Sequence, residues 1–361
     1  MLYHIFYPLK VYFSPLNILG YITFRSIMAI LCSLILCYII GKILIPYLRK
    51  KQFVQIIRTD GPKTHLKKSG TPTMGGLIIL ISIILSTLLW ARLNNRFIII
   101  ILISVLWLGL IGFFDDYVKI IKKNPKGISA NQKLLMQLLL AIGIGIYLYY
   151  FPSHNDFRTK INIPYLKDVY IDLGIFYILF VILIIVGSSN AVNLTDGLDG
   201  LAIGCLIVCA LTYAILSYSA GHFKVAQYLK IIYVGGSGEL SVFLASVLGA
   251  GLGFLWFNCY PADIFMGDSG SLFLGGSLGI IAVFIKHELI LIIIGGIFVI
   301  EAVSVILQVY SYKRYKKRIF LMAPLHHHFE IKGLSESKIT IRCWIINIVL
   351  ALLALSSLKI R

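Results

Sequence analysis

Long apolar runs recur along almost the whole chain, and they constrain its fold more than any other feature. A membrane-spanning helix needs about 20 apolar residues to cross a hydrocarbon core of roughly 30 Å. The chain of 361 residues is 59% hydrophobic and 13% charged, a balance typical of polytopic membrane proteins. We therefore expect an all-α integral membrane protein that forms a single domain over residues 1–361. Its ten predicted transmembrane helices lie at residues 22–45, 75–91, 97–114, 134–150, 173–189, 200–219, 240–257, 271–285, 289–309 and 340–358.

The distribution of positive charge predicts which ends of these spans face the cytoplasm. One set of loops carries 19 Lys and Arg, whereas the other loops and the two termini carry 12. Short cytoplasmic loops are enriched in Lys and Arg, so we expect the first set in the cytoplasm and both termini in the periplasm. The net charge of +18 is then better explained by contact with membrane lipids than by nucleic acid, which we do not expect as a partner. The first set comprises residues 46–74, 115–133, 190–199, 258–270 and 310–338.

The six cysteines are scattered along the chain, without a C-x-x-C pair, and most of them fall inside predicted spans. We expect them to serve as small apolar residues, with no disulfide framework and no zinc site. The first residues lack the sequence pattern of a signal peptide, so none is expected.

Carboxylates stand at the ends of apolar runs, where a membrane protein normally avoids them. Asp115 and Asp116 follow one run directly, and Asp196 and Asp199 lie in a glycine-rich segment after another. A charge near lipid costs several kcal/mol unless water, a partner or a metal compensates it. The predicted spans place these residues on the cytoplasmic side, together with Asp268 and the histidines at 326–328. We therefore expect a single reaction centre there.

Several aspartates in glycine-rich loops, without cysteine ligands, suit a hard cation such as Mg²⁺. Such an ion serves phosphoryl transfer by bridging phosphate oxygens and neutralising charge. Asp115 and Asp116 are adjacent and point about 100° apart on a helix, so one can face a metal and the other a reacting group. A single Asp-Gly pair is more often a turn, and the hypothesis therefore depends on the aspartates together.

Three further features are less specific. Lys67, Lys68 and Thr73 form either a phosphate-binding loop or a basic loop that touches lipid headgroups. His326, His327 and His328 are either metal ligands or hydrogen-bonding groups in a packed turn or against an anionic substrate, since adjacent helical residues cannot all converge on one ion. Glu301 lies in the middle of a predicted span, so we expect it to face the interior of the bundle and make a structural hydrogen bond.

Six segments together resemble the bacterial phospho-N-acetylmuramoyl-pentapeptide transferases, in the order expected for that family. The segments that begin at Phe113, Asn190 and Phe265 also belong to the wider superfamily of polyprenyl-phosphate sugar-1-phosphate transferases, whereas the triple-histidine segment is typical of the peptidoglycan branch. The segments are Phe113-Phe-Asp-Asp-Tyr117, Asn190-Ala-Val-Asn-Leu-Thr-Asp-Gly-Leu-Asp-Gly-Leu201, Phe265-Met-Gly-Asp268, Asp60-Gly-Pro…Gly-Thr-Pro-Thr-Met-Gly-Gly76, Gly253-Phe-Leu-Trp-Phe-Asn258 and Met322-Ala-Pro-Leu-His-His-His-Phe329.

The resemblance implies a Mg²⁺-dependent enzyme of the bacterial cytoplasmic membrane, with its active site on the cytoplasmic face. It would transfer phospho-N-acetylmuramoyl-pentapeptide from UDP-MurNAc-pentapeptide to undecaprenyl phosphate, giving lipid I and UMP. The family also implies a homodimer and a groove open to the bilayer for the prenyl chain. The sequence leaves open whether the lipid phosphate attacks directly or through a covalent intermediate.

The resemblance also assigns roles to individual residues. Asp268 would be the Mg²⁺ ligand, Asp115 the base that deprotonates the lipid phosphate, and Asp116 a support for the metal or the diphosphate. Lys133 would help to compensate phosphate charge, although Asn131 nearby departs from the family's pattern, as Ser269 does beside Asp268. The residues implied to bind the sugar nucleotide are Asn193, Asp196 and Asp199, Phe265 stacked on uracil with Lys68, Thr73 and Asn258 nearby, and His326, His327 and His328.

Two rival functions share some of these features. A polyprenyl-phosphate N-acetylhexosamine-1-phosphate transferase would keep the aspartates but lack the triple-histidine segment. A transporter would instead place polar residues near the middle of several spans and show internal repeats. Only Glu301 stands clearly at midspan here, and no repeat is evident.

Overall fold

The computed structural model describes residues 1–53, 70–122, 127–166 and 169–359. In this part of the chain, eight helices are long and apolar enough to cross a membrane, and two further apolar helices are shorter. The eight are α2 (Ile22–Lys50), α4 (Arg96–Lys122), α5 (Ala130–Tyr150), α6 (Phe176–Thr195), α7 (Leu201–Gly221), α9 (Glu239–Asn258), α12 (Gly296–Tyr315) and α14 (Glu336–Ser356). The shorter two are α3 (Gly76–Trp90) and α10 (Asp268–Phe284). Each predicted span corresponds to one of these ten helices, so the all-α polytopic fold is confirmed.

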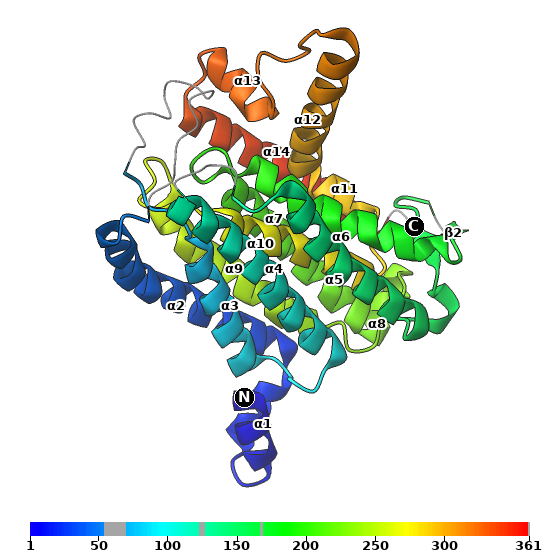
Figure 1. Ribbon diagram of the computed structural model, residues 1–361. Coiled ribbons are helices and arrows are strands. Elements are labelled where there is room, and N and C mark those ends of the chain that lie inside the picture. The colour runs from blue at the N-terminus through cyan, green and yellow to red at the C-terminus, as the bar shows by residue number, and fades with distance from the viewer. Residues whose placement is uncertain (54–69, 123–126, 167–168, 360–361) are drawn as a thin grey trace.

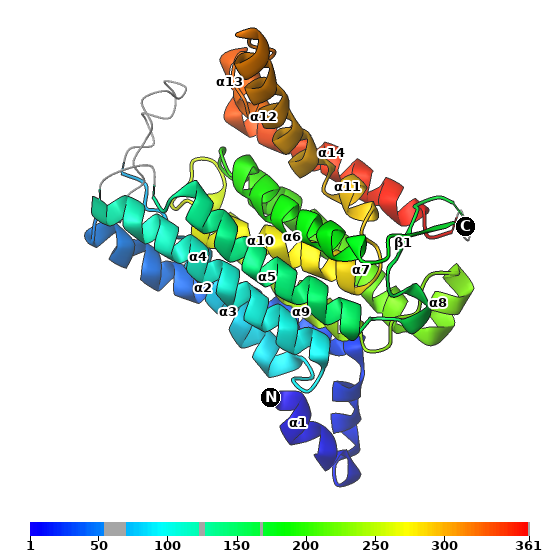
Figure 2. The same ribbon diagram turned by 45° about the vertical axis from the view of Figure 1, so that its right-hand side comes forward.

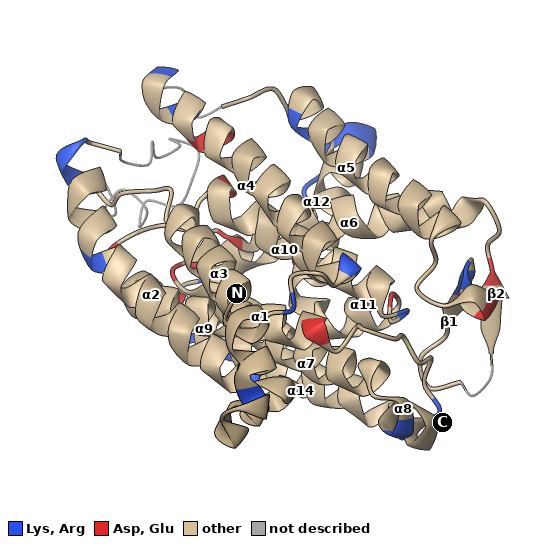
Figure 3. Ribbon diagram, turned by 90° about the horizontal axis from the view of Figure 1, so that it is seen from below, with Lys and Arg blue, Asp and Glu red and all other residues tan. Residues whose placement is uncertain are grey.

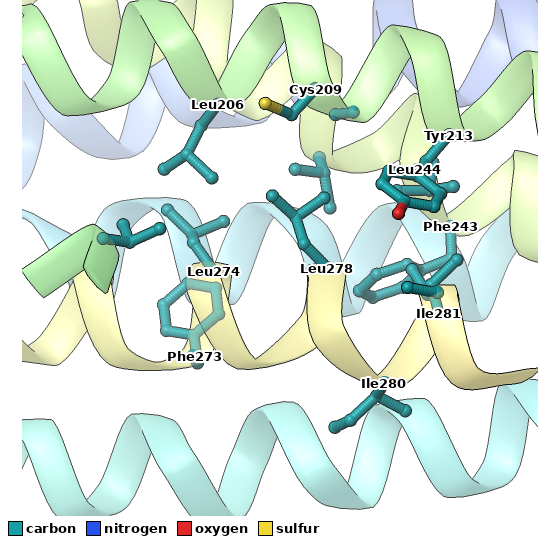
Figure 4. Packing of buried hydrophobic residues seen from close by; sticks show 14 of the residues in the cluster. Leu206, Cys209, Tyr213, Phe243, Leu244, Phe273, Leu274, Leu278, Ile280 and Ile281 are labelled. Carbon is teal, nitrogen blue, oxygen red and sulfur yellow. The ribbon is translucent and has the colours of Figure 1, made fainter. Parts of the chain in front are cut away.

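Helix α10 lies at the centre of the bundle and is packed between α4 and α6 (Figures 1 and 2). Leu206 of α7 faces Leu274 of α10 in the buried core (Figure 4). Small residues let the neighbouring backbones approach closely, as is common between helices in membranes. At Gly275 of α10, for example, a Cβ atom would lie 2.5 Å from the Ser188 carbonyl oxygen of α6.

The two ends of the bundle carry different elements. One end carries α13 (Leu325–Ile331), which follows α12 (Figure 2). The opposite end carries the N-terminal arm, which is formed by α1 (Leu2–Phe6), η1 (Tyr7–Val11) and η2 (Ser14–Gly20). It also carries η4 (Asn155–Phe157), the antiparallel pair β1 (Lys160–Asn162) and β2 (Tyr170–Asp172), and α8 (Phe223–Leu229). Lys and Arg lie mostly at the ends of the long helices and in their connections, and apolar residues form the sides of the bundle (Figure 3).

Two predictions about helix boundaries are wrong. We predicted that a loop begins at Asp115, but α4 continues to Lys122, so Asp115 and Asp116 lie inside a helix. The apolar run ends at Phe114, but residues 115–122 contain neither glycine nor proline and so do not stop the helix. The ninth predicted span is split at Gly295 into α11 (Ile290–Ile294) and α12, and the Gly295–Gly296 pair explains why the helix breaks there.

Candidate active site

The close approach of α10 to α4 brings the aspartates of the two helices together. Gly112 of α4 faces the first residues of α10, and a Cβ atom there would lie 2.1 Å from the carbonyl oxygen of Asp268. Gly267 has a φ of 73°, a left-handed conformation that a residue with a side chain rarely adopts. The α10 helix therefore starts directly beside the aspartates of α4 because glycine stands at both positions.

Asp116 holds the first turn of α10 in place. Its carboxylate accepts hydrogen bonds from the backbone N–H of Asp268 at 3.2 Å and of Ser269 at 2.9 Å. Both N–H groups belong to the first turn of a helix, where they have no partner within the helix itself. Asp116 is only 3% exposed, so this contact joins α4 to α10 in the interior of the protein.

Three carboxylates converge at this junction. Asp115, Asp116 and Asp268 each offer an oxygen atom, and these atoms lie within 4.8 Å of one another. Asp115 is buried together with Asp116, whereas Asp268 is half-buried. A metal ion would fit among these three residues. The sequence predicted only Asp268 as a ligand, whereas the group also contains two aspartates of α4.

Two lysines contact these carboxylates. The ammonium nitrogen of Lys119 lies 2.6 Å from Asp115 Oδ2, 3.0 Å from Asp268 Oδ2 and 3.6 Å from Asp116 Oδ1. The ammonium group of Lys133 lies 3.2 Å from Asp115 Oδ2 and also contacts Asp268. Lys133 was predicted to compensate phosphate charge, whereas no role was predicted for Lys119. Its position four residues after Asp115 would have indicated the pairing if α4 had been predicted to extend this far.

The end of α6 supplies two more polar residues to the same place. The amide of Asn193 donates to Asp268 Oδ1 at 2.7 Å and to Ser271 Oγ at 2.8 Å. Asp196 follows the last residue of α6, and the Gly267 backbone N–H donates to its carboxylate. Burial raises the pKa of Asp196 to about 8, and the negative charges of Asp268 and Asp116 add to this effect. We refer to Asp115, Asp116, Asp196 and Asp268 as the acidic cluster.

Thr73 and Phe265 lie in a pair of backbone segments next to the acidic cluster. Phe265 donates its N–H to the Pro72 carbonyl at 2.9 Å, and its own carbonyl accepts from Gly75 N–H at 2.9 Å. Thr73 is buried, and its hydroxyl lies 3.0 Å from where a Cβ atom on Gly267 would stand. Lys68 and Lys67, which were predicted to join them, lie outside the described residues.

Asp199 and Asn258 are close to the site, and their side chains hold backbone in place. The carboxylate of Asp199 accepts from Ala262 N–H at 3.1 Å. The amide group of Asn258 accepts from Gly200 N–H at 3.1 Å and donates to the Ile264 carbonyl at 2.8 Å. Both were predicted to bind substrate. The hydrogen bonds indicate a further task, which is to fix the loops that carry Asp196 and Phe265.

The three histidines at the start of α13 point to different partners. His326 is buried against Glu301, and its Nδ1 lies 3.2 Å from Glu301 Oε2. His327 Nδ1 lies 3.2 Å from Glu330 Oε2, and His328 Nδ1 accepts from Leu321 N–H at 3.1 Å. Among the residues that the structure describes, only Asp115, Asp116 and Asp268 form a group that could hold a metal. The packed turn therefore fits the geometry better than a histidine metal site, and the contact of these histidines with the sugar nucleotide stays a prediction.

Buried ion pairs at the opposite end of the bundle were not predicted from the sequence. Arg25 donates to both oxygens of Glu239, at 2.7 and 2.6 Å, and the Arg92 backbone N–H donates to the same carboxylate at 3.0 Å. Just beyond α10, Lys286 lies 3.3 Å from Glu288 in the interior. These ion pairs join residues that are far apart in the sequence or that lie in short connections, so no local pattern indicated them.

Comparison with known proteins gives one consistent family. A family model described as Glycosyl transferase family 4 matches residues 98–286, and a Phospho-N-acetylmuramoyl-pentapeptide-transferase signature matches residues 68–80. Curated proteins named phospho-N-acetylmuramoyl-pentapeptide-transferase match over the full length of both chains. They are 55% identical in Endomicrobium trichonymphae, 55% in Citrifermentans bemidjiense and 54% in Thermodesulfovibrio yellowstonii.

Proposed function

Because the chain belongs to the phospho-N-acetylmuramoyl-pentapeptide-transferase family, we propose that its reaction takes place at the acidic cluster between α4 and α10. The chain is a multi-pass membrane enzyme that forms lipid I from UDP-MurNAc-pentapeptide and undecaprenyl phosphate. The convergence of three carboxylates from two helices is the observation that carries the choice of site. Its position beside the start of α10 and the end of α6, rather than in the middle of the bundle, would let a soluble nucleotide and a lipid meet there.

The residues present fit Mg²⁺ as the metal. All the ligand atoms are carboxylate oxygens, which hard divalent cations prefer, and no cysteine contributes to the group. With every group ionised, the four carboxylates of the acidic cluster outweigh the ammonium groups of Lys119 and Lys133 by two negative charges. Asp116 and Asp268 would hold the ion, and Asp115 would lie beside it. When bound, it would neutralise charge on the diphosphate and polarise the phosphoryl group under attack.

The protein's own side chains have three tasks in this reaction. Asp115 accepts the last proton of the lipid phosphate, whose oxygen then attacks the phosphorus that carries the sugar. The new P–O bond forms while the diphosphate bond to UMP breaks, and UMP leaves with its negative charge. Lys119 and Lys133 offset the negative charges of the two reactants, which would otherwise repel each other. Asp116 keeps α10, and with it Asp268, at the required distance.

The sugar nucleotide would bind on the side of the acidic cluster formed by the end of α6 and by the loop before α10. Asn193 and Asp196 face Asp268 from this side, and Phe265 offers a half-buried ring for stacking on uracil. Thr73 supports the same loop. We further propose that this end of the bundle faces the cytoplasm, where the nucleotide is available, and that the enzyme acts as a homodimer.

Purified protein incubated with undecaprenyl phosphate and one UDP-sugar at a time tests this function. We expect lipid I and UMP to form from UDP-MurNAc-pentapeptide and no product to form from UDP-N-acetylglucosamine. Product formation from UDP-N-acetylglucosamine alone would favour the N-acetylhexosamine-1-phosphate transferase instead. Labelling of single cysteines near Asp268 in intact cells and in inverted vesicles tests the orientation, and labelling from the periplasmic side would contradict it.

A further inference from the structure

Glu301 is a buried carboxylate outside the acidic cluster, and its partner lies in another helix. It is 4% exposed on α12, six residues after the break at Gly295. Both of its oxygens lie within hydrogen-bonding distance of the His326 backbone N–H, at 3.2 and 3.3 Å, and Oε2 lies 3.2 Å from the ring nitrogen Nδ1. Glu301 therefore holds the backbone of His326 at the start of α13 by a hydrogen bond and packs against one side of its imidazole.

The other side of the imidazole presses against the turn that carries Asp196. His326 is 1% exposed, and a Cβ atom on Gly197 would lie 2.3 Å from its Nε2. Real Cβ atoms do not come so close to another heavy atom, so only glycine fits at position 197 while the ring keeps this place. Neither ring nitrogen of His326 has a hydrogen-bond partner in the part of the chain that the structure describes, although Nδ1 lies 3.2 Å from Glu301 Oε2. The position of the imidazole is therefore set by packing against Gly197 and by Glu301.

The same turn is held on its other side by α14. Glu336 accepts a hydrogen bond from Asp199 N–H at 2.7 Å, and the Trp344 indole N–H donates to the Gly200 carbonyl at 3.2 Å. The turn thus lies between α14 and the Glu301–His326 pair. While α14 holds the end of the turn at Gly200 and Gly267 N–H donates to Asp196, the imidazole is the packing contact that limits the position of Gly197.

We propose that Glu301 is a positioning residue, which acts through His326 on the turn from Asp196 to Asp199 and thereby sets the affinity for the sugar nucleotide. This inference rests on the proposed function, which assigns Asn193 and Asp196 to the nucleotide side of the acidic cluster. Removing the Glu301 carboxylate leaves the buried His326 N–H without its acceptor and empties the space beside Nδ1, a change that disfavours the observed position of His326. The turn then relaxes away from Asp268.

Steady-state kinetics of Glu301→Ala and Glu301→Gln in the full-length enzyme test the proposal. We expect Glu301→Ala to raise the KM for UDP-MurNAc-pentapeptide by about tenfold or more, since one lost buried hydrogen bond corresponds to this range. The KM for undecaprenyl phosphate should stay within about twofold, because the lipid does not bind through this turn. Glu301→Gln keeps an oxygen acceptor for the His326 N–H and should recover most of the nucleotide affinity.

A nucleotide KM for Glu301→Ala close to that of the wild type would overturn the proposal, even if kcat or thermal stability falls. A rise in the lipid KM instead of the nucleotide KM, or a Glu301→Gln variant no better than Glu301→Ala, would overturn it as well. Failure of the proposed function would be seen in a different measurement, since the wild-type enzyme itself would then make no lipid I.

Gly197→Ala approaches the same contact from the other side and serves if the Glu301 variants do not fold. The added methyl group must displace the imidazole, so we expect the same rise in nucleotide KM as in Glu301→Ala. Gly187→Ala in α6 is the matched control, because a Cβ atom there meets nothing within 4 Å, and it should leave both KM values unchanged. A Gly197→Ala variant that behaves like Gly187→Ala would contradict the proposal.

Discussion

The two ends of helix α10 both bury charge, but only one end buries it in balance. Beyond its C-terminal end, one ammonium group, on Lys286, faces one carboxylate, on Glu288, and the Tyr177 hydroxyl donates to Glu288 at 2.8 Å. At its N-terminal end, the four carboxylates of the acidic cluster face two ammonium groups of the described residues. In a buried pair of one ammonium group and one carboxylate, the two charges compensate each other. A buried cluster with excess carboxylates needs a further cation if all of them are to stay ionised in a low-dielectric interior. The comparison separates a structural ion pair from a reaction centre.

The largest expected effect comes from neutralising a carboxylate at the unbalanced end. Asp268→Asn, Asp115→Asn and Asp116→Asn should each lower kcat for lipid I formation by about 10³-fold or more, because each variant loses a charge that the transition state requires. The isosteric change at the balanced end, Glu288→Gln, is the control and should keep most of the activity. Activity near that of the wild type in any of the three aspartate variants would remove that residue from the reaction.

A smaller effect is expected when a cation of the site is removed. Lys119→Ala should lower kcat by about 10²-fold, since its ammonium group offsets the charge of Asp115, Asp268 and the reactants. Lys122, three residues further along the same helix, is exposed, and Lys122→Ala should leave activity unchanged. Equal activities of the two variants would contradict a contribution of the Lys119 contact with the acidic cluster to catalysis.

At the balanced end, stability should change and activity should not. Lys286→Ala leaves Glu288 buried without its cation, which typically costs about 3–5 kcal/mol of folding free energy. Thermal denaturation should show a lower Tm, whereas kcat and KM of the folded enzyme stay within about twofold. A specific loss of kcat at unchanged Tm would assign this end a part in catalysis and would break the comparison.

The smallest expected effect is a pH-dependent stability difference at Asp196. Its pKa is raised from an ordinary value of 3.8 to about 8. The folded protein therefore keeps a proton that the unfolded chain releases, and stability falls as the pH rises between these two values. In the presence of a chelator, Asp196→Asn should gain in Tm over the wild type as the pH rises from 5 to 8, by at least about 2 °C. A Tm difference that does not change with pH would contradict the raised pKa.

The sequence predicted the ten helices well, because a long apolar run has few alternatives to a membrane-spanning helix. It predicted Asp115, Asp116 and Asp268 as one group from the side on which their loops should lie. It did not predict which atoms meet. Lys119 was missed because the predicted span ended at the first charged residue, although α4 continues to Lys122.

Contacts between distant segments were beyond a local pattern. The Glu301 prediction, a buried residue with a structural hydrogen bond, is confirmed, but its partner His326 lies 25 residues away in α13. The pairing of Arg25 with Glu239 spans 214 residues and could not be inferred from either neighbourhood. Likewise, nothing near Asn258 in the sequence indicates that its amide group holds Gly200.

Direct measurement of metal binding tests the central claim most directly. Mn²⁺ binding can be followed by electron paramagnetic resonance in the wild type, Asp268→Asn and Glu288→Gln, with Mg²⁺ as a competitor. The unbalanced charge predicts one site per chain in the wild type and in Glu288→Gln, displaced by Mg²⁺, and loss of that site in Asp268→Asn. Undiminished binding in Asp268→Asn, or an active wild type that binds no divalent ion, would contradict it.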